Sequence, residues 1–234
     1  MTQLLISVKN VDESLIALHA GADVIDLKDP ENGAFGALDI FTSEQIVRAI
    51  NGRVKVSAAV GEHYRKVSEL VDAIYVYQSI GVNIIKLAVN NLLAEPDFEI
   101  EILKITAKNI KLIAVFFVDE SFDLSHLEQI AVLGFFGVML DTKHKHKNLL
   151  LNSTENDLYL FAEACKKMHL KYGLAGSLRL IHVEQLKRLN PTYLGFRGGV
   201  CKDYKRASVL LPQSVSNIKK LLLKHNNINH THLI

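Results

Sequence analysis

Three charged side chains stand inside runs that otherwise resemble buried β-strands. The run at 23–28 (DVIDLK) carries Asp26 and Lys28, and the run at 83–89 (NIIKLAV) carries Lys86. Successive side chains of a strand point to opposite faces, so Asp26 and Lys28 point together, away from the intervening leucine. Burial and a cationic neighbour both lower the pKa of a lysine, and a neutral lysine attacks carbonyl carbon to give a Schiff base. The pattern therefore indicates covalent chemistry on an aldehyde or a ketone.

Eight short apolar runs predict eight β-strands, with segments of helical spacing between them. The predicted strands are residues 3–8, 23–28, 53–60, 83–89, 111–119, 137–141, 171–177 and 193–198. The predicted helices include residues 14–19, 43–50, 68–80 and 152–169, with Ser43, Ser68 and Ser125 as N-cap residues.

The number and spacing of these units favour a closed barrel. Dividing 234 residues among eight units gives about 29 residues each, which suits a (β/α)8 TIM barrel of ~250 residues. An open doubly wound sheet is the alternative, but it usually has a glycine-rich turn after its first strand, and the turn SVKNVDE has no glycine. We predict an α/β protein with one (β/α)8 domain at 1–211, then a closing helix and a polar tail at 212–234.

In such a barrel the helices cover the outside, so the charged strand residues must face the inside. The same alternation turns Asp141 inward at the end of GVMLD, and Arg197 inward after YLGF. A single lysine is usually a solvated surface residue, but two inward lysines at one end of a barrel weaken that interpretation. We therefore expect Lys28, Lys86, Asp141 and Arg197 around one cavity at the carboxyl ends of the strands, where this fold places its active sites.

Two segments rich in small residues follow the last two predicted strands. LAGSL (174–178) and GFRGGV (195–200) let backbone N–H groups approach an anion, at the place where this fold often binds phosphate. The predicted phosphate-binding residues are Gly176, Ser177, Arg197, Gly198 and Gly199. Ser177 has no histidine and acid arranged as a triad, so it is interpreted as a phosphate contact. The three lysines of KHKHK (143–147) repel cations, so no metal site is expected there.

Composition excludes several classes of protein. The chain has 27 Lys and Arg against 25 Asp and Glu, which gives no case for a nucleic-acid partner. Two distant cysteines make neither a disulfide framework nor a zinc-ligand set. With no signal-peptide pattern and no apolar run of ~18 residues, we expect a soluble cytoplasmic protein with no membrane partner. Its oligomeric state stays open, and a homo-oligomer is one option.

The ordered motifs resemble those of the (5-formylfuran-3-yl)methyl phosphate synthase family. They are IDLKDP followed by GAFGAL, then KLAV, LDTxxxK, and the pair AGSL and GFRGGVC, and they extend from Leu4 to about Ser208. The resemblance implies a (β/α)8 lyase that needs no cofactor. It would act on the carbon–oxygen bond of a phosphate ester and condense two glyceraldehyde 3-phosphate molecules, with loss of phosphate and water. The product, 4-(hydroxymethyl)-2-furancarboxaldehyde phosphate, would supply the furan ring of methanofuran.

The resemblance also implies catalytic roles. Lys28 matches the Schiff-base lysine, Lys86 the proton-transfer lysine, and Asp141 and Lys145 the acidic and basic residues of LDTxxxK. The Lys- and His-rich run leaves open whether Lys143, Lys145 or Lys147 takes the basic role. Asp26 and Asp141 are expected to orient the lysines and to move protons. The alternatives are a phosphosugar-binding barrel with no covalent step, and an isomerase or aldolase acting on a related triose phosphate.

Overall fold

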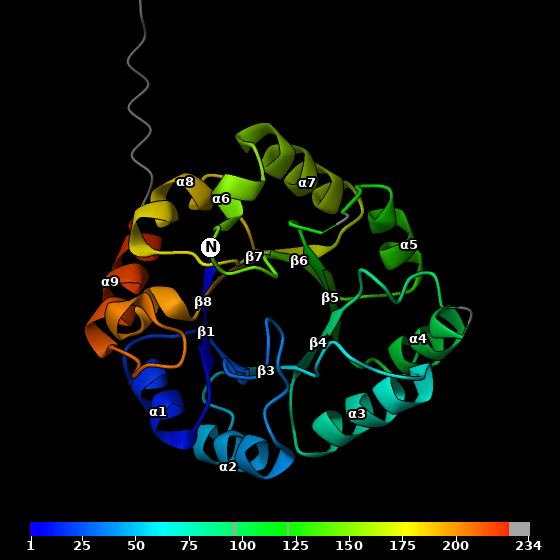
Figure 1. Ribbon diagram of the computed structural model, residues 1–234, viewed down its shortest axis with the longest axis horizontal. Helices are drawn as coiled ribbons and strands as arrows, with labels where there is room; N and C mark the ends of the chain where they lie inside the picture. Colours follow the sequence, from blue (N-terminus) through cyan, green and yellow to red (C-terminus); the bar gives the residue numbers. More distant parts are fainter. Residues whose placement is uncertain (96, 121, 225–234) are drawn as a thin grey trace, which may run out of the picture.

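Eight parallel strands close into a barrel in the computed structural model, which describes residues 1–95, 97–120 and 122–224 (Figure 1). The strands are β1 (Gln3–Val8), β2 (Val24–Leu27), β3 (Lys55–Ala59), β4 (Ile84–Ala88), β5 (Leu112–Phe117), β6 (Gly137–Asp141), β7 (Lys171–Leu174) and β8 (Tyr193–Phe196). Strand β1 pairs with both β2 and β8, which closes the sheet. The predicted single (β/α)8 barrel is confirmed.

Helices surround this barrel as an outer ring (Figure 1). They are α1 (Val11–His19), α2 (Ile40–Ile50), α3 (Val67–Ser79), α4 (Phe98–Thr106), α5 (His126–Val132), α6 (Leu149–Asn152), α7 (Glu155–Lys167), α8 (Val183–Lys187) and α9 (Pro212–Leu223). Helix α9 contacts both α8 and α1, so it occupies the last place in the ring. The predicted polar tail falls largely at 225–234, outside the described residues. None of the described helices is long and apolar enough to cross a membrane.

The predicted alternation of side chains holds along the strands. Ile25 and Leu27 are fully buried in the larger apolar cluster, between the sheet and its helices. Val24 belongs to a second, smaller cluster inside the barrel. Asp26 shares the inward face with Val24 and is also fully buried. A charged layer therefore replaces apolar packing inside this end of the barrel.

Two of the three predicted N-caps are wrong. Helix α2 begins earlier than predicted, because the carboxylate of Asp39 accepts the backbone N–H of Thr42. Ser43 therefore lies within α2, and Ser68 likewise lies within α3. Ser125 does take the N-cap position of α5, although its side chain makes no capping hydrogen bond.

The long helix predicted at 152–169 is two helices. Asn152 ends the short helix α6, and α7 begins at Glu155. Thr154 starts α7 with a reciprocal capping box, in which its hydroxyl accepts the N–H of Asp157 and its own N–H donates to the Asp157 carboxylate.

The loops after β7 and β8 are in direct contact. A Cβ at Gly199 would lie 2.0 Å from the carbonyl oxygen of Leu178, so only glycine allows this approach. Gly176 has a φ of +101°, in the region that favours glycine, and packs against Thr142. Gly199 thus holds the loop after β8 against the loop after β7, and Gly176 holds the latter against the residue that follows β6.

Gly199→Ala should force these loops apart. We expect the unfolding free energy to fall by about 1–3 kcal/mol, as in other overpacked sites, with a lower melting temperature in calorimetry. An unchanged melting temperature would mean that the two loops separate at no cost.

Candidate active site

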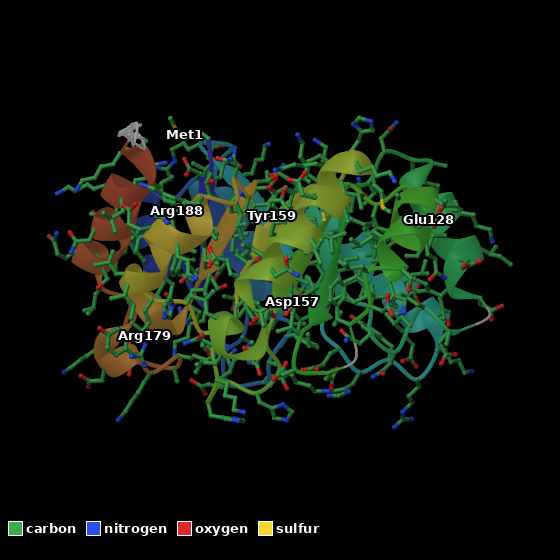
Figure 2. All side chains as sticks on the ribbon, turned by 90° about the horizontal axis from the view of Figure 1, so that it is seen from above. Met1, Glu128, Asp157, Tyr159, Arg179 and Arg188 are labelled. Carbon is green, nitrogen blue, oxygen red and sulfur yellow. The ribbon has the colours of Figure 1, made fainter. Side chains whose placement is uncertain are left out.

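All ten residues predicted for the site line one cavity of about 240 Å³ at the carboxyl ends of the strands. They are Asp26, Lys28, Lys86, Asp141, Lys145, Gly176, Ser177, Arg197, Gly198 and Gly199. Figure 2 shows Arg179, which also lines the cavity, at the end of the barrel opposite to Met1. The cavity therefore lies where enzymes of this fold carry out their chemistry.

Lys86 is held by a carboxylate inside the barrel. Its Nζ lies 2.7 Å from Oδ1 of Asp26, and both side chains are at most 3% exposed. Asp26 also accepts hydrogen bonds of 2.7 Å from the hydroxyls of Ser7 and Ser57. These serines are its register partners on the two neighbouring strands, β1 and β3. The strand register thus places two hydroxyl groups beside Asp26, and Lys86 reaches the same carboxylate from β4.

Asp141 binds the other two lysines of the cavity. Its Oδ1 lies 2.8 Å from Nζ of Lys145, and its Oδ2 lies 3.4 Å from Nζ of Lys28. The N–H of Thr142 also donates to Oδ1, at 2.7 Å. Burial alone raises the pKa of Asp141, but the two lysine charges and these hydrogen bonds outweigh it and hold the pKa well below its usual range.

Lys28 is the lysine of this site prepared to lose its proton. Burial lowers its pKa to about 8, against the partial opposition of Asp141 and with help from the charges of Lys145 and Lys86. Roughly one Lys28 side chain in ten is then neutral at pH 7. Its carboxylate partner lies farther away than the partner of Lys86, at 3.4 Å against 2.7 Å. Geometry and charge therefore separate two lysines that strand alternation leaves equivalent.

Phe35 covers both lysines and was not predicted. Its ring centroid lies 5.2 Å from Nζ of Lys28 and 5.5 Å from Nζ of Lys86, and the side chain is 1% exposed. An antiparallel bridge between Asp29 and Gly36 folds the loop after β2 back on itself and directs this ring into the barrel mouth. The motif GAFGAL was the available signal, because it places one aromatic ring between small residues beside Lys28.

Arg197 lines the cavity, but most of its donors bind other protein groups. Both terminal nitrogens donate to the carboxylate of Glu13, one of them also donates to the carbonyl of Ser7 at 3.1 Å, and Nε donates to the carbonyl of Arg206 at 2.7 Å. Both partners of the pair with Glu13 are at most 7% exposed. Arg197 thus fastens the end of β8 to α1, and its predicted contact with phosphate stays a prediction.

Arg206 is a second guanidinium on the cavity wall that sequence reasoning did not single out. It is half-buried, and one of its terminal nitrogens donates to the carbonyl of Gly33 at 3.2 Å. The backbone N–H groups of Gly198 and Gly199 lie on the same wall and have no acceptor among the described residues. The basic cluster at 202–206 was the signal in the sequence for a cationic side chain here, although residue spacing does not show which way its side chains point.

The loop after β6 separates the lysines of the KHKHK run. The carboxylate of Asp119 accepts the N–H groups of Lys143 and His144, each at 2.7 Å. Lys143 then pairs with Glu120 at 2.6 Å, whereas Lys145 enters the cavity. Lys147 is exposed. Of the three lysines, only Lys145 thus lies where the basic role of LDTxxxK would require it.

A family model described as 4-HFC-P synthase matches residues 4–219. The chain belongs to this family. A Methanosarcina barkeri protein named (5-formylfuran-3-yl)methyl phosphate synthase is 30% identical over 219 residues, which cover 88% of this chain and 94% of that protein. A Methylorubrum extorquens protein, named as a candidate for the same synthase, is 38% identical over 209 residues, 89% of this chain and 86% of the relative. The family is thus one of enzymes named for a synthase reaction.

Solved structures share the fold of this family member at low identity. A 3-hexulose-6-phosphate synthase from Salmonella typhimurium has a TM-score of 0.69 and 12% identity, with 96% of this chain and all of the other covered. A phosphoribosyl anthranilate isomerase from Thermus thermophilus has a TM-score of 0.67 and 13% identity, with 94% and 98% covered. At this level of identity the likeness shows the barrel fold alone.

Opposite shifts of the Lys28 pKa should follow from two substitutions. Asp141→Asn removes a charge that raises this pKa, so the value should fall below about 8. Lys145→Met removes a charge that lowers it, so the value should rise. Each shift should be on the order of one unit. The rate at which fluorodinitrobenzene labels Lys28, followed against pH by peptide mass spectrometry, measures both; shifts in the same direction would contradict this charge arrangement.

Proposed function

We propose that this protein condenses two glyceraldehyde 3-phosphate molecules to 4-(hydroxymethyl)-2-furancarboxaldehyde phosphate through a Schiff base on Lys28. The supporting observation is a buried lysine with a pKa of about 8 beside Asp141 and Lys145, in a cavity at the catalytic end of the barrel. Family membership supports the same product. Overall the reaction loses phosphate and water without oxidation or reduction, as expected of a carbon–oxygen lyase, and the product would supply the furan ring of methanofuran.

The first step is formation of the iminium. The neutral amine of Lys28 attacks the carbonyl carbon of one triose phosphate, after isomerisation to an enolisable form, and the resulting carbinolamine loses water. That departing oxygen needs a proton. The ammonium of Lys145, which donates to Asp141 at 2.8 Å, is the proposed donor at this point of the cavity.

The second step removes the acidified C–H next to the iminium and gives an enamine. Lys86 is the proposed proton-transfer group, because its Nζ faces the same cavity as Lys28. The pair of Lys86 and Asp26, 2.7 Å apart, is the proposed acceptor of the substrate proton. The enamine then attacks the second aldehyde, and elimination of phosphate, ring closure and dehydration give the aromatic furan. Water hydrolyses the iminium, which releases the aldehyde and restores the amine of Lys28.

The substrate phosphate is proposed to bind beside the loops after β7 and β8. The free backbone N–H groups of Gly198 and Gly199, with Ser177 and Gly176 opposite, form a concave wall that suits an anion. Arg206 supplies the guanidinium charge at this wall. Arg197 has one N–H left for the phosphate, and its main proposed role is to hold the loop through Glu13.

Trapping the Schiff base tests this function most cheaply. Borohydride added with glyceraldehyde 3-phosphate should leave a stable adduct on Lys28, located by peptide mass spectrometry. Lys28→Arg should abolish both adduct and product, because a guanidinium stays protonated. Lys86→Arg should lose turnover yet keep the adduct at Lys28, and Lys147→Arg, on the exposed side of the loop after β6, is the matched control. A wild-type protein that binds the substrate without an adduct would instead favour a non-covalent phosphosugar-binding barrel or isomerase.

The two arginines of the phosphate wall should respond differently to removal. Arg206→Ala should raise the KM for glyceraldehyde 3-phosphate more than it lowers kcat, because a lost ground-state contact weakens binding. Arg197→Ala leaves the carboxylate of Glu13 buried and unpaired, so the unfolding free energy should fall by about 3–5 kcal/mol. Steady-state kinetics and denaturant titration separate these outcomes. A stable Arg197→Ala protein whose only defect is a raised KM would reverse the two roles.

A further inference from the structure

A second cavity opens beside the first at the same end of the barrel. It has a volume of about 420 Å³ and is lined by residues on or after β3 to β6. Its wall includes Tyr64, Arg65, Ala88, Asn91, Phe117 and Lys143. Ala88 and Phe117 lie at the inward-facing ends of β4 and β5, so this cavity adjoins the interior of the barrel rather than the helix ring.

The ring of Phe35 contacts a lining residue of each cavity. On one side it lies 5.2 Å from Nζ of Lys28, which lines the first cavity. On the other side it packs edge-on against Phe117, with ring centroids 6.1 Å apart, and Phe117 lines the second cavity. The backbone N–H of Phe35 also donates to the carboxylate of Glu62, which lines the second cavity, at 3.3 Å. The rings of Phe35 and Phe117 thus connect Lys28 with the second cavity.

The rim of the second cavity carries positive charge that the protein does not neutralise by direct contact. Arg65 and Lys66 are exposed there, and neither side chain pairs with a carboxylate in the part of the chain that the structure describes. Lys143 is paired, with Glu120 at 2.6 Å. The other two carboxylates of the wall are Glu62, which lies 3.9 Å from Nζ of Lys143, and Glu95. An incoming anion would therefore meet Arg65 and Lys66 first.

We propose that this second cavity binds the second phosphorylated aldehyde, with its phosphate at Arg65 and Lys66 and its carbonyl directed toward Phe35. The inference rests on the proposed condensation at Lys28. Phe35 then lies between the two bound substrates. Its loop must shift before the enamine carbon of the first substrate can contact the aldehyde carbon of the second.

Two separate phosphate sites follow from the charges of the reactants. Each triose phosphate brings a phosphate group that is close to dianionic at neutral pH. Their repulsion halves when the distance between them doubles, so binding on opposite sides of the barrel mouth favours both substrates being present together. The first cavity has its anion-binding wall at the loops after β7 and β8, and the second has its cations at the loop after β3.

The bond that forms between the two substrates needs no further reactant. The enamine carbon donates its electron pair to the aldehyde carbon of the second molecule, and a carbon–carbon bond forms. The carbonyl electron pair moves to oxygen, which takes a proton, and the nitrogen on Lys28 returns to the iminium. Lys86 also touches the Phe35 ring, at 5.5 Å, so a proton donor lies close to the new alkoxide.

The test compares adduct formation by the first substrate at Lys28 with the rate of product formation, which also requires the second substrate. Arg65→Gln removes an exposed charge, and Ala88→Leu fills the second cavity; Lys147→Gln, which lines neither cavity, is the control. Borohydride trapping with glyceraldehyde 3-phosphate reports the first site, and the ultraviolet absorbance of the furan aldehyde reports product. Both variants should trap at Lys28 like the wild type. The rate of product formation at low substrate should fall roughly tenfold or more for Arg65→Gln, the loss expected for one charge-assisted contact. It should also fall for Ala88→Leu, because the larger side chain occupies the space of the second substrate.

The dependence of the product-formation rate on substrate concentration distinguishes the two variants. Arg65→Gln should recover most of its rate at high glyceraldehyde 3-phosphate, because only binding is weakened, whereas Ala88→Leu should not. Wild-type substrate dependence in both variants, with normal trapping, would overturn the second site and leave the Schiff-base function intact. Loss of trapping in both variants would also overturn it, because the second cavity would then serve the first substrate. No adduct in the wild type would reject the proposed function itself.

Discussion

Charge burial inside the barrel is the constraint on which the site depends. Asp26, Lys28, Lys86 and Asp141 are each at most 6% exposed, and a buried ion without a partner costs several kcal/mol. The barrel resolves this with two arrangements: one lysine against one carboxylate at 2.7 Å, and two lysines sharing the carboxylate of Asp141. The shared arrangement leaves a lysine that is only partly compensated. Burial, together with the charges of Lys145 and Lys86, lowers the pKa of Lys28, as the proposed nucleophilic role requires.

The sequence was sufficient to predict the barrel fold and the charged residues at the carboxyl ends of its strands. Strand alternation alone turned Asp26, Lys28, Lys86 and Asp141 inward, because the period of two is fixed by the backbone and both faces of a barrel strand are buried. Eight runs of similar spacing then brought them to one end. The first residues of the helices were less predictable. Asp39, and not Ser43, is the N-cap residue of α2, because the choice between neighbouring cap residues depends on loop geometry.

The contacts that assign roles could not be read from the sequence. Arg197 and Glu13 are separated by 184 positions, and nothing local indicates that the end of β8 meets α1 there. A guanidinium next to glycines therefore resembled a phosphate ligand, whereas its donors bind the buried carboxylate of Glu13 and the carbonyls of Ser7 and Arg206. The same limit applies to Phe35, whose place over both lysines depends on a loop folding back across the barrel mouth. The alternation of side chains along a strand predicts which face each side chain points to. Only tertiary packing decides which opposite charges form pairs.

The central claim is that unequal pairing of buried charges makes Lys28 the nucleophile and keeps Lys86 for proton transfer. A crystal structure of the protein after borohydride reduction with glyceraldehyde 3-phosphate tests it most directly. We expect continuous density from Nζ of Lys28 to a substrate carbon, with Lys86 still paired to Asp26 at about its present 2.7 Å. Density joining the substrate to Lys86, with Lys28 still on Asp141, would contradict the account.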